Sequence, residues 1–124
     1  MNDDRLRILV LDIVSKTLLH SLKQNSLFSV TIGKLRTVKL SMKPDVIVFE
    51  YSKIYDSNAM QKRMINLIYK FKIKPIIIAY MDSWEYNIQK QAELFGVDKT
   101  FSKAQIDEVN NSMIRYISNC LLDI

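Results

Sequence analysis

The chain has 124 residues, of which 48% are hydrophobic and 25% are charged, and it carries a net charge of +5. This length and composition fit one globular domain spanning residues 1–124 and exclude a disordered or fibrous protein. No apolar run approaches the ~20 residues of a membrane span, and the acidic start of the chain does not resemble a secretory signal. Two glycines are too few for a glycine-rich phosphate loop, which argues against a Rossmann or P-loop enzyme. The single cysteine, Cys120, fits a reducing cytosol, so we expect a cytoplasmic protein.

Five segments have the apolar runs or the alternation of β-strands. In chain order they cover residues 7–12, 28–32, 44–50, 75–80 and, as a very short strand, 100–101. The first and third of these strands end on an acid, Asp12 and Glu50. An acidic side chain at the carboxyl edge of a parallel sheet lies where open α/β proteins keep their functional groups, so both are candidate site residues.

Helical spacing of apolar residues predicts the segments between the strands. Ser15 is a suitable N-cap for the first helix, a short second helix is expected over residues 35–42, and a third over residues 58–71. Asp82 or Ser83 is expected to cap a fourth helix over residues 84–95 that stops at Gly96, and a last helix covers residues 104–121. Together these elements predict an α/β fold with a doubly wound, five-stranded parallel sheet, a flavodoxin-like (βα)5 sandwich of three layers.

Basic residues cluster over residues 34–43 and 62–74. Such clusters can attract phosphate backbones or acidic partners. Here they alternate with apolar core positions and have no aromatic platforms between them, which favours a solvated surface. A nucleic-acid-binding module remains the alternative that we rank last.

The order of these motifs resembles the receiver domain of two-component response regulators, the CheY-like family, over essentially the whole chain. The resemblance rests on the strand ending at Asp12, the Pro-Asp run ending at Glu50, the Pro-led strand ending at Tyr80, and the Gly-Val-Asp-x-x-Phe-x-Lys motif over residues 96–103. Tyr80 follows Glu50 by 30 residues and Lys103 follows Tyr80 by 23, and both intervals are typical of that family. The stretch between Asp12 and Glu50 is short for the family, so we expect its first two helices to be trimmed.

The resemblance implies a pocket in which some positions match and others depart. Asp12 matches the first acid and Lys103 the lysine that contacts the phosphoryl group. Ile13 stands in place of the second acid, a direct metal ligand, and Glu50 in place of the phosphoacceptor aspartate. Tyr80 replaces the hydroxyl residue, and Met81 the small residue after it. The chain is therefore expected to be a pseudo-receiver with a degenerate phosphorylation site.

These departures predict that the site neither binds Mg²⁺ nor accepts a phosphoryl group. Hard divalent cations need several oxygen ligands, and phosphoryl transfer needs the charge neutralisation that the cation supplies. Glutamate is one methylene longer than aspartate, and a misplacement of the reacting group by about 1 Å strongly lowers the rate of catalysis. We therefore expect no catalytic residue, no cofactor and no enzymatic activity, with Asp12 as a weak candidate metal ligand only.

Glu50 has two interpretations within this framework. It can mimic a phosphorylated aspartate by reaching Lys103, or it can form an inert ion pair with Lys103, because a buried charge needs a partner. We favour the ion pair, with Asp12 as a structural acid that helps to hold Lys103.

Receiver domains commonly signal through the face built from their fourth helix, fifth strand and fifth helix, which here corresponds to residues 84–95, 100–101 and 104–121. Trp84, Thr100 and Tyr116 are the candidate interface residues; packing at the rim is the simpler interpretation of Trp84, and Thr100 stands where the family often has a switch aromatic.

The leading hypothesis is a phosphorylation-independent module that acts through protein contacts, as a homodimer, in transcription regulation or as an adaptor. Contact with DNA would then come through an effector domain appended in a longer regulator, and no membrane is involved. A Mg²⁺-dependent phosphoacceptor with altered chemistry is the alternative.

Overall fold

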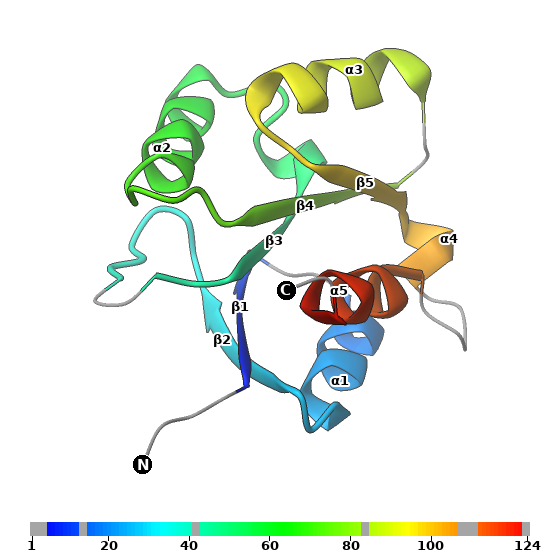
Figure 1. Cartoon of the computed structure of the whole chain (residues 1–124). Coiled ribbons are helices and arrows are strands. Elements are labelled where there is room, and N and C mark those ends of the chain that lie inside the picture. Colours follow the sequence, from blue (N-terminus) through cyan, green and yellow to red (C-terminus); the bar gives the residue numbers. More distant parts are fainter. Residues whose placement is uncertain (1–4, 13–14, 41–42, 83–84, 107–111, 123–124) are drawn as a thin grey trace.

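The computed structural model describes residues 5–12, 15–40, 43–82, 85–106 and 112–122, without the side chains of residues 53, 106, 121 and 122. Five parallel strands form one sheet in the order β2-β1-β3-β4-β5 (Figure 1). Their bounds are β1 Leu6–Leu11, β2 Phe28–Gly33, β3 Val46–Glu50, β4 Ile76–Met81 and β5 Lys99–Ser102. All five predicted strands are confirmed to within one or two residues, and so is the doubly wound parallel sheet.

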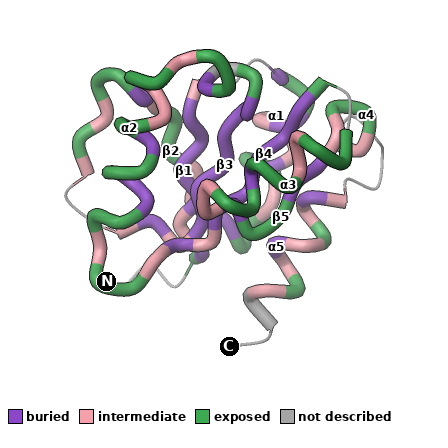
Figure 2. The backbone as a smooth tube through the Cα atoms, turned by 90° about the horizontal axis from the view of Figure 1, so that it is seen from above, coloured by how far each residue is buried: buried purple, intermediate pink, exposed green. Residues whose placement is uncertain are grey.

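Two helical layers enclose this sheet. Alternate residues of β1 point to opposite faces, with Ile8 and Val10 under α1 (Lys16–Gln24) and α5 (Ser112–Leu122), and Leu9 and Leu11 under α2 (Asn58–Ile68) and α3 (Tyr86–Phe95). Figure 1 shows these two helix pairs on opposite sides of the sheet. Every residue of β3 is buried, as expected for a central strand covered on both faces (Figure 2).

The helix ends follow local side-chain chemistry. Ser15 Oγ accepts a hydrogen bond from the Leu18 amide at 3.2 Å, so the predicted N-cap of α1 is confirmed. Gly96 ends α3 with a φ of 117°, a left-handed conformation that favours glycine. The predicted start of α3 is wrong: Glu85, not Asp82, holds the N-cap position, and its side chain makes no capping hydrogen bond. Ser83 lies outside the described residues.

The expected helix over residues 35–42 is absent from the described part of that segment. Residues 35–37 form a turn, in which the Thr37 and Val38 amides both donate to Lys34 O, and residues 38–40 continue without helix or strand. The side chain of Leu35 anchors this loop because it is buried in the cluster beneath α2. The second helix is therefore not only shortened, as expected, but replaced by a loop.

Two other predicted helices have different bounds in the structure. α2 ends at Ile68 rather than residue 71, and the chain then turns back toward β4 through exposed residues such as Ile73. The expected last helix corresponds to a short α4, Lys103–Ile106, and to α5, with residues 107–111 outside the described part. A 3-10 turn, η1 (Tyr51–Lys53), directly follows β3.

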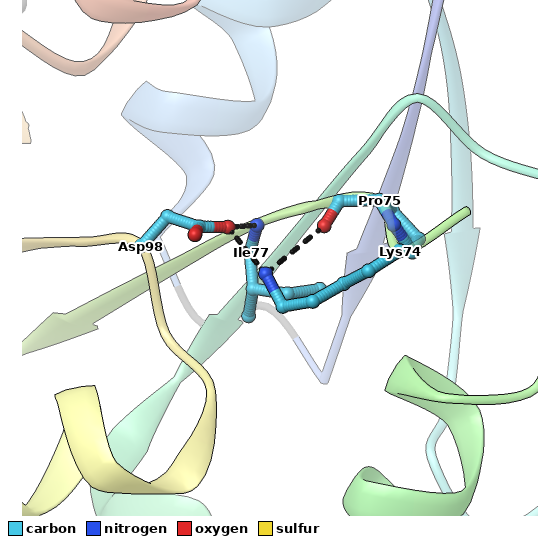
Figure 3. Close-up of polar contacts among 4 residues, drawn as sticks. All are labelled: Lys74, Pro75, Ile77 and Asp98. Carbon is cyan, nitrogen blue, oxygen red and sulfur yellow. Dashed lines mark hydrogen bonds and ion pairs between the residues drawn. The ribbon is translucent and has the colours of Figure 1, made fainter.

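Aspartates at the start of two strands hold neighbouring strands in register. Asp98 Oδ2 accepts hydrogen bonds from the Ile77 amide at 2.8 Å and from Lys74 Nζ at 2.7 Å, and Lys74 Nζ also donates to Pro75 O (Figure 3). Asp45 Oδ2 accepts a bond of 2.8 Å from the Arg7 amide in the same way. The aspartates of the Pro-Asp and Gly-Val-Asp motifs thus pair β3 with β1 and β5 with β4.

Candidate functional site

The sheet brings three of the predicted site residues to one edge. β1 and β3 are in register up to Leu11 and Phe49, so Asp12 and Glu50 follow side by side at their carboxyl ends. Glu50 in turn pairs with Tyr80 of β4. This is the edge at which open α/β sheets place their functional groups.

Glu50 is a buried carboxylate with one satisfied and one unsatisfied oxygen. Its exposed fraction is 7%, and its Oε1 accepts a hydrogen bond of 2.9 Å from Ser52 Oγ in η1. Its Oε2 is buried without a hydrogen-bond partner among the described groups. Such an oxygen forgoes the hydration that an exposed carboxylate keeps, which costs free energy.

Asp12 is hydrogen-bonded to the end of β2 and to the loop that follows it. It has a φ of 51°, a left-handed conformation that aspartate tolerates better than most residues. Its amide donates to Gly33 O at 3.0 Å, and its Oδ2 accepts from the Leu35 amide at 3.1 Å. Asp12 therefore holds the loop at Leu35, and it forms no ion pair with Lys103 among the described residues.

The expected ion pair of Glu50 with Lys103 is wrong. Lys103 is exposed, and within the described part of the chain no ion pair connects it with Glu50 or with Asp12. The residues on either side of Lys103 cap each other: Gln105 Oε1 accepts from the Ser102 amide at 2.8 Å, and Ser102 Oγ accepts from the Gln105 amide at 3.3 Å. This reciprocal capping box starts α4 directly at Lys103. The Ser-x-x-Gln pattern was visible in the sequence and would have located this helix start.

Tyr80 and Met81 place two bulky side chains at the end of β4, and Tyr80 is the register partner of Glu50. Both are buried, and the ring of Tyr80 belongs to the core cluster that includes Phe101 and Met113. A cavity of about 180 Å³ near this edge is lined by Met81, Ser52 and Tyr51 among others, but not by Glu50. Burial, and secondarily the charge of Tyr55, raises the pKa of the Tyr51 phenol at the wall of this cavity.

The described residues do not fit a divalent cation. No group of three or more His, Cys, Asp or Glu side chains gathers among them to hold a metal ion. One oxygen of Asp12 and one of Glu50 are already engaged with Leu35 and Ser52. Mg²⁺ requires near-octahedral oxygen ligation, of which the remaining oxygens of Asp12 and Glu50 would supply at most two ligands. Ile13, at the position of the family's second acid, lies outside the described residues.

Solved receiver structures align with nearly the whole chain. A response regulator receiver protein from Pseudoalteromonas atlantica has a TM-score of 0.67 at 12% identity and covers 93% of this chain and 98% of its own. A CheY-like response regulator protein from Mesorhizobium loti has a TM-score of 0.62 at 9% identity, covering 93% and 97%. The ChxR receiver domain from Chlamydia trachomatis has a TM-score of 0.61 at 14% identity, again covering 93% and 97%. The chain has the receiver fold. No family model and no curated protein matches the sequence.

The predicted interface residues of this receiver fold lie largely against its own core. Thr100 is buried, with an exposed fraction of 9%, and Tyr116 is partly buried with its ring edge-on to Phe101 at a centroid distance of 6.0 Å. Trp84 lies outside the described residues. None of the described helices is long and apolar enough to cross a bilayer.

Exposed apolar side chains gather elsewhere, on α2 and α3. Leu94 is 90% exposed and Tyr69, which caps the end of α2, is 58% exposed. Both line a cavity of about 440 Å³ that Ile65 and Phe95 also line. Leu94 and Tyr69 fall outside the apolar helical spacing that predicts α2 and α3, so this surface was not predicted.

Proposed function

We propose that this chain is a receiver-like regulatory module that acts through protein–protein contacts and does not transfer a phosphoryl group. The observation that carries the proposal is the separation of Glu50 from Lys103. Glu50 is buried and bonded to Ser52, whereas Lys103 is exposed and makes no ion pair with it among the described residues. In the receiver family the acceptor acid and this lysine act on the same phosphoryl group.

The surroundings of Glu50 support the same proposal. Phosphoryl transfer depends on positioning and on neutralising charge at the attacking and leaving oxygens. Here Asp12 is bonded to the Leu35 amide, and the buried Tyr80 and Met81 occupy the positions of smaller family residues. No lysine forms an ion pair with the carboxylate among the described residues.

The rival function is a Mg²⁺-dependent phosphoacceptor with altered chemistry. One observation favours it: Glu50 Oε2 has no partner among the described groups and stands at the acceptor position. A carboxylate oxygen in this state can take a cation. The rival therefore makes a clear prediction, namely that Mg²⁺ binds next to Glu50.

Incubation with a small phosphodonor and Mg²⁺, followed by intact-mass measurement, separates the two functions. We expect no phosphoryl adduct, and we expect no Mg²⁺-dependent change in the amide shifts of Asp12 and Glu50 or in the fluorescence of the single tryptophan. Glu50→Gln is the matched control, since it keeps the shape and removes the carboxylate. An adduct on the original chain that is absent from Glu50→Gln contradicts the proposal and establishes the rival.

The proposal includes a homodimer through the face of α3, β5 and α5, in transcription control or as an adaptor, in the cytoplasm and without enzymatic activity. A polar hollow of about 550 Å³ lies on this face, lined by Gln89, Glu93 and Lys99 among others. Sedimentation analysis tests the dimer. We expect Lys99→Glu to weaken it and Lys16→Glu, a charge reversal on the exposed start of α1, to leave it intact; a monomeric original chain contradicts this part of the proposal.

A further inference from the structure

The loop that replaces the second helix is held against α2 by two basic side chains. Arg63 Nη1 donates to Arg36 O at 2.9 Å, and Lys70 Nζ donates to Leu40 O at 3.1 Å. These bonds join segments that are 27 and 30 residues apart in the chain. The two basic clusters of the sequence thus meet on one surface.

This contact creates a cavity of about 280 Å³ with an aliphatic floor and a cationic rim. The floor is the aliphatic part of the lining: Leu35 and Leu67 are buried and Val38 and Leu40 are half-buried, with the polar Asn66 also lining the cavity. The rim carries Arg36, Arg63 and Lys70. Leu40 also lines a second cavity of about 280 Å³, whose walls include Arg7, Lys39 and Lys43.

The positive charge of this surface is not neutralised within the described part of the chain. Neither cavity is lined by an aspartate or a glutamate, and residues 34–43 and 58–74 contain no acid at all. None of Arg36, Lys39, Arg63 and Lys70 forms an ion pair with a described carboxylate. The nearby acid Asp12 is bonded to the Leu35 amide. A partner of opposite charge is therefore attracted to this surface. Its binding breaks no ion pair between these basic residues and a described carboxylate.

The aliphatic floor distinguishes between two classes of anionic partner. A phosphodiester backbone gains nothing from leucine and valine side chains, and no aromatic ring lines either cavity on which a base could stack. A peptide with both carboxylates and leucine-like side chains uses the rim and the floor together. Arginine retains donors after one bond to a carbonyl and pairs with carboxylates in bidentate geometry.

We infer that the surface between α2 and the loop over residues 34–40 is a docking site for an acidic, amphipathic peptide segment of a protein partner. Its leucine-like side chains occupy the cavity floored by Leu35 and Leu67, and its carboxylates pair with Arg36 and Arg63. This surface lies away from α3, β5 and α5, and the inference does not depend on whether Glu50 accepts a phosphoryl group.

Fluorescence anisotropy with the full chain tests the inference. The probe is a labelled synthetic peptide in which leucine recurs at helical spacing among glutamates. We expect binding that weakens with salt, because ion pairs at an exposed rim are screened. Arg36→Glu should lower the affinity more than about tenfold, since it replaces charge-assisted bonds by repulsion. Lys16→Glu is the matched control: it makes the same charge change on α1, across the sheet, and should change the affinity less than about twofold.

Four results would each overturn a different part of the inference. Equal weakening by Arg36→Glu and Lys16→Glu overturns the inference, because net charge alone would then explain the binding. Undiminished binding of a peptide with serine in place of leucine overturns the role of the floor. Tighter binding of a random-sequence duplex DNA than of the peptide overturns the choice of partner. Amide shifts confined to residues 35–40 and 62–70 support the docking site, whereas shifts confined to α3 and β5 overturn it. Arg63→Glu also removes the bond to Arg36 O, so Arg36→Glu is the deciding variant.

Discussion

Glu50 and Ser52 are hydrogen-bonded to each other at the end of β3, where Ser52 Oγ donates to Glu50 Oε1 at 2.9 Å. The other oxygen, Glu50 Oε2, is buried with no partner among the described groups. Only one of the two carboxylate oxygens therefore has a hydrogen bond that replaces the hydration lost on burial. Because an uncompensated buried charge costs free energy, Glu50 destabilises the fold relative to an apolar residue of similar length.

The first prediction concerns this pair. Glu50→Met should raise the free energy of unfolding by about 1 kcal/mol or more, because it removes a buried charge and fills the same volume. Ser52→Ala should lower it by about 1 kcal/mol in the original chain and leave it unchanged in Glu50→Met. Urea unfolding of the four proteins measures both effects. Ser26→Ala, in the exposed turn before β2, is the control. A destabilised Glu50→Met would mean that Glu50 has a stabilising partner.

The second prediction separates the two bonds that Asp98 accepts. Asp98→Ala should cost about 1–3 kcal/mol, because the Ile77 amide of β4 loses its acceptor. Lys74→Ala removes only a half-exposed ion pair and should cost less than about 1 kcal/mol, with a cost that fades as salt is added. Denaturant unfolding at low and high salt tests the difference. Equal costs for the two variants would show that the ion pair, not the strand contact, is the stabilising part.

The third prediction concerns Gly96 at the end of α3. Gly96→Ala should lower the free energy of unfolding by about 1–2 kcal/mol, because its φ of 117° strains any residue with a Cβ. The new Cβ would also lie 3.1 Å from Tyr69 Oη. Adding Tyr69→Phe should recover only a small part of the loss, since the backbone strain remains. Gly33→Ala is the comparison: its φ is not positive, and the new Cβ would lie 3.3 Å from Val38 Cγ2, so its loss should be smaller.

The fourth prediction concerns alkaline pH. Burial raises the pKa of Tyr116, and the neighbouring Cys120 raises it further. The unfolded chain then ionises first as the pH rises past about 10, so Tyr116 should reduce stability from that pH upward and have no such effect below it. Cys120→Ala should lower the pKa of Tyr116 while leaving it above the ordinary value, because burial is the larger cause. The phenolate absorbance difference between each protein and its Tyr116→Phe variant measures this pKa. An unchanged pKa in Cys120→Ala would contradict the coupling.

The strands could be predicted from the sequence because their causes are local. Apolar runs such as that of β3 specify burial on both faces, and Ser15 and Gly96 end their helices through bonds and dihedrals within a few residues. The capping box of Ser102 and Gln105 was equally local and went unnoticed.

The character of the site depended on contacts between distant segments, which no local pattern encodes. The sequence by itself determined that Glu50 ends a buried strand at the carboxyl edge of the sheet. Only the tertiary structure decided that Glu50 bonds to Ser52 while Lys103 stays exposed, that Asp12 holds the loop at Leu35, and that Arg63 and Lys70 join that loop to α2. The physical reason is that a charged side chain takes the partner that strand register and helix starts bring within a hydrogen-bond length, whatever partner its place in the sequence suggests.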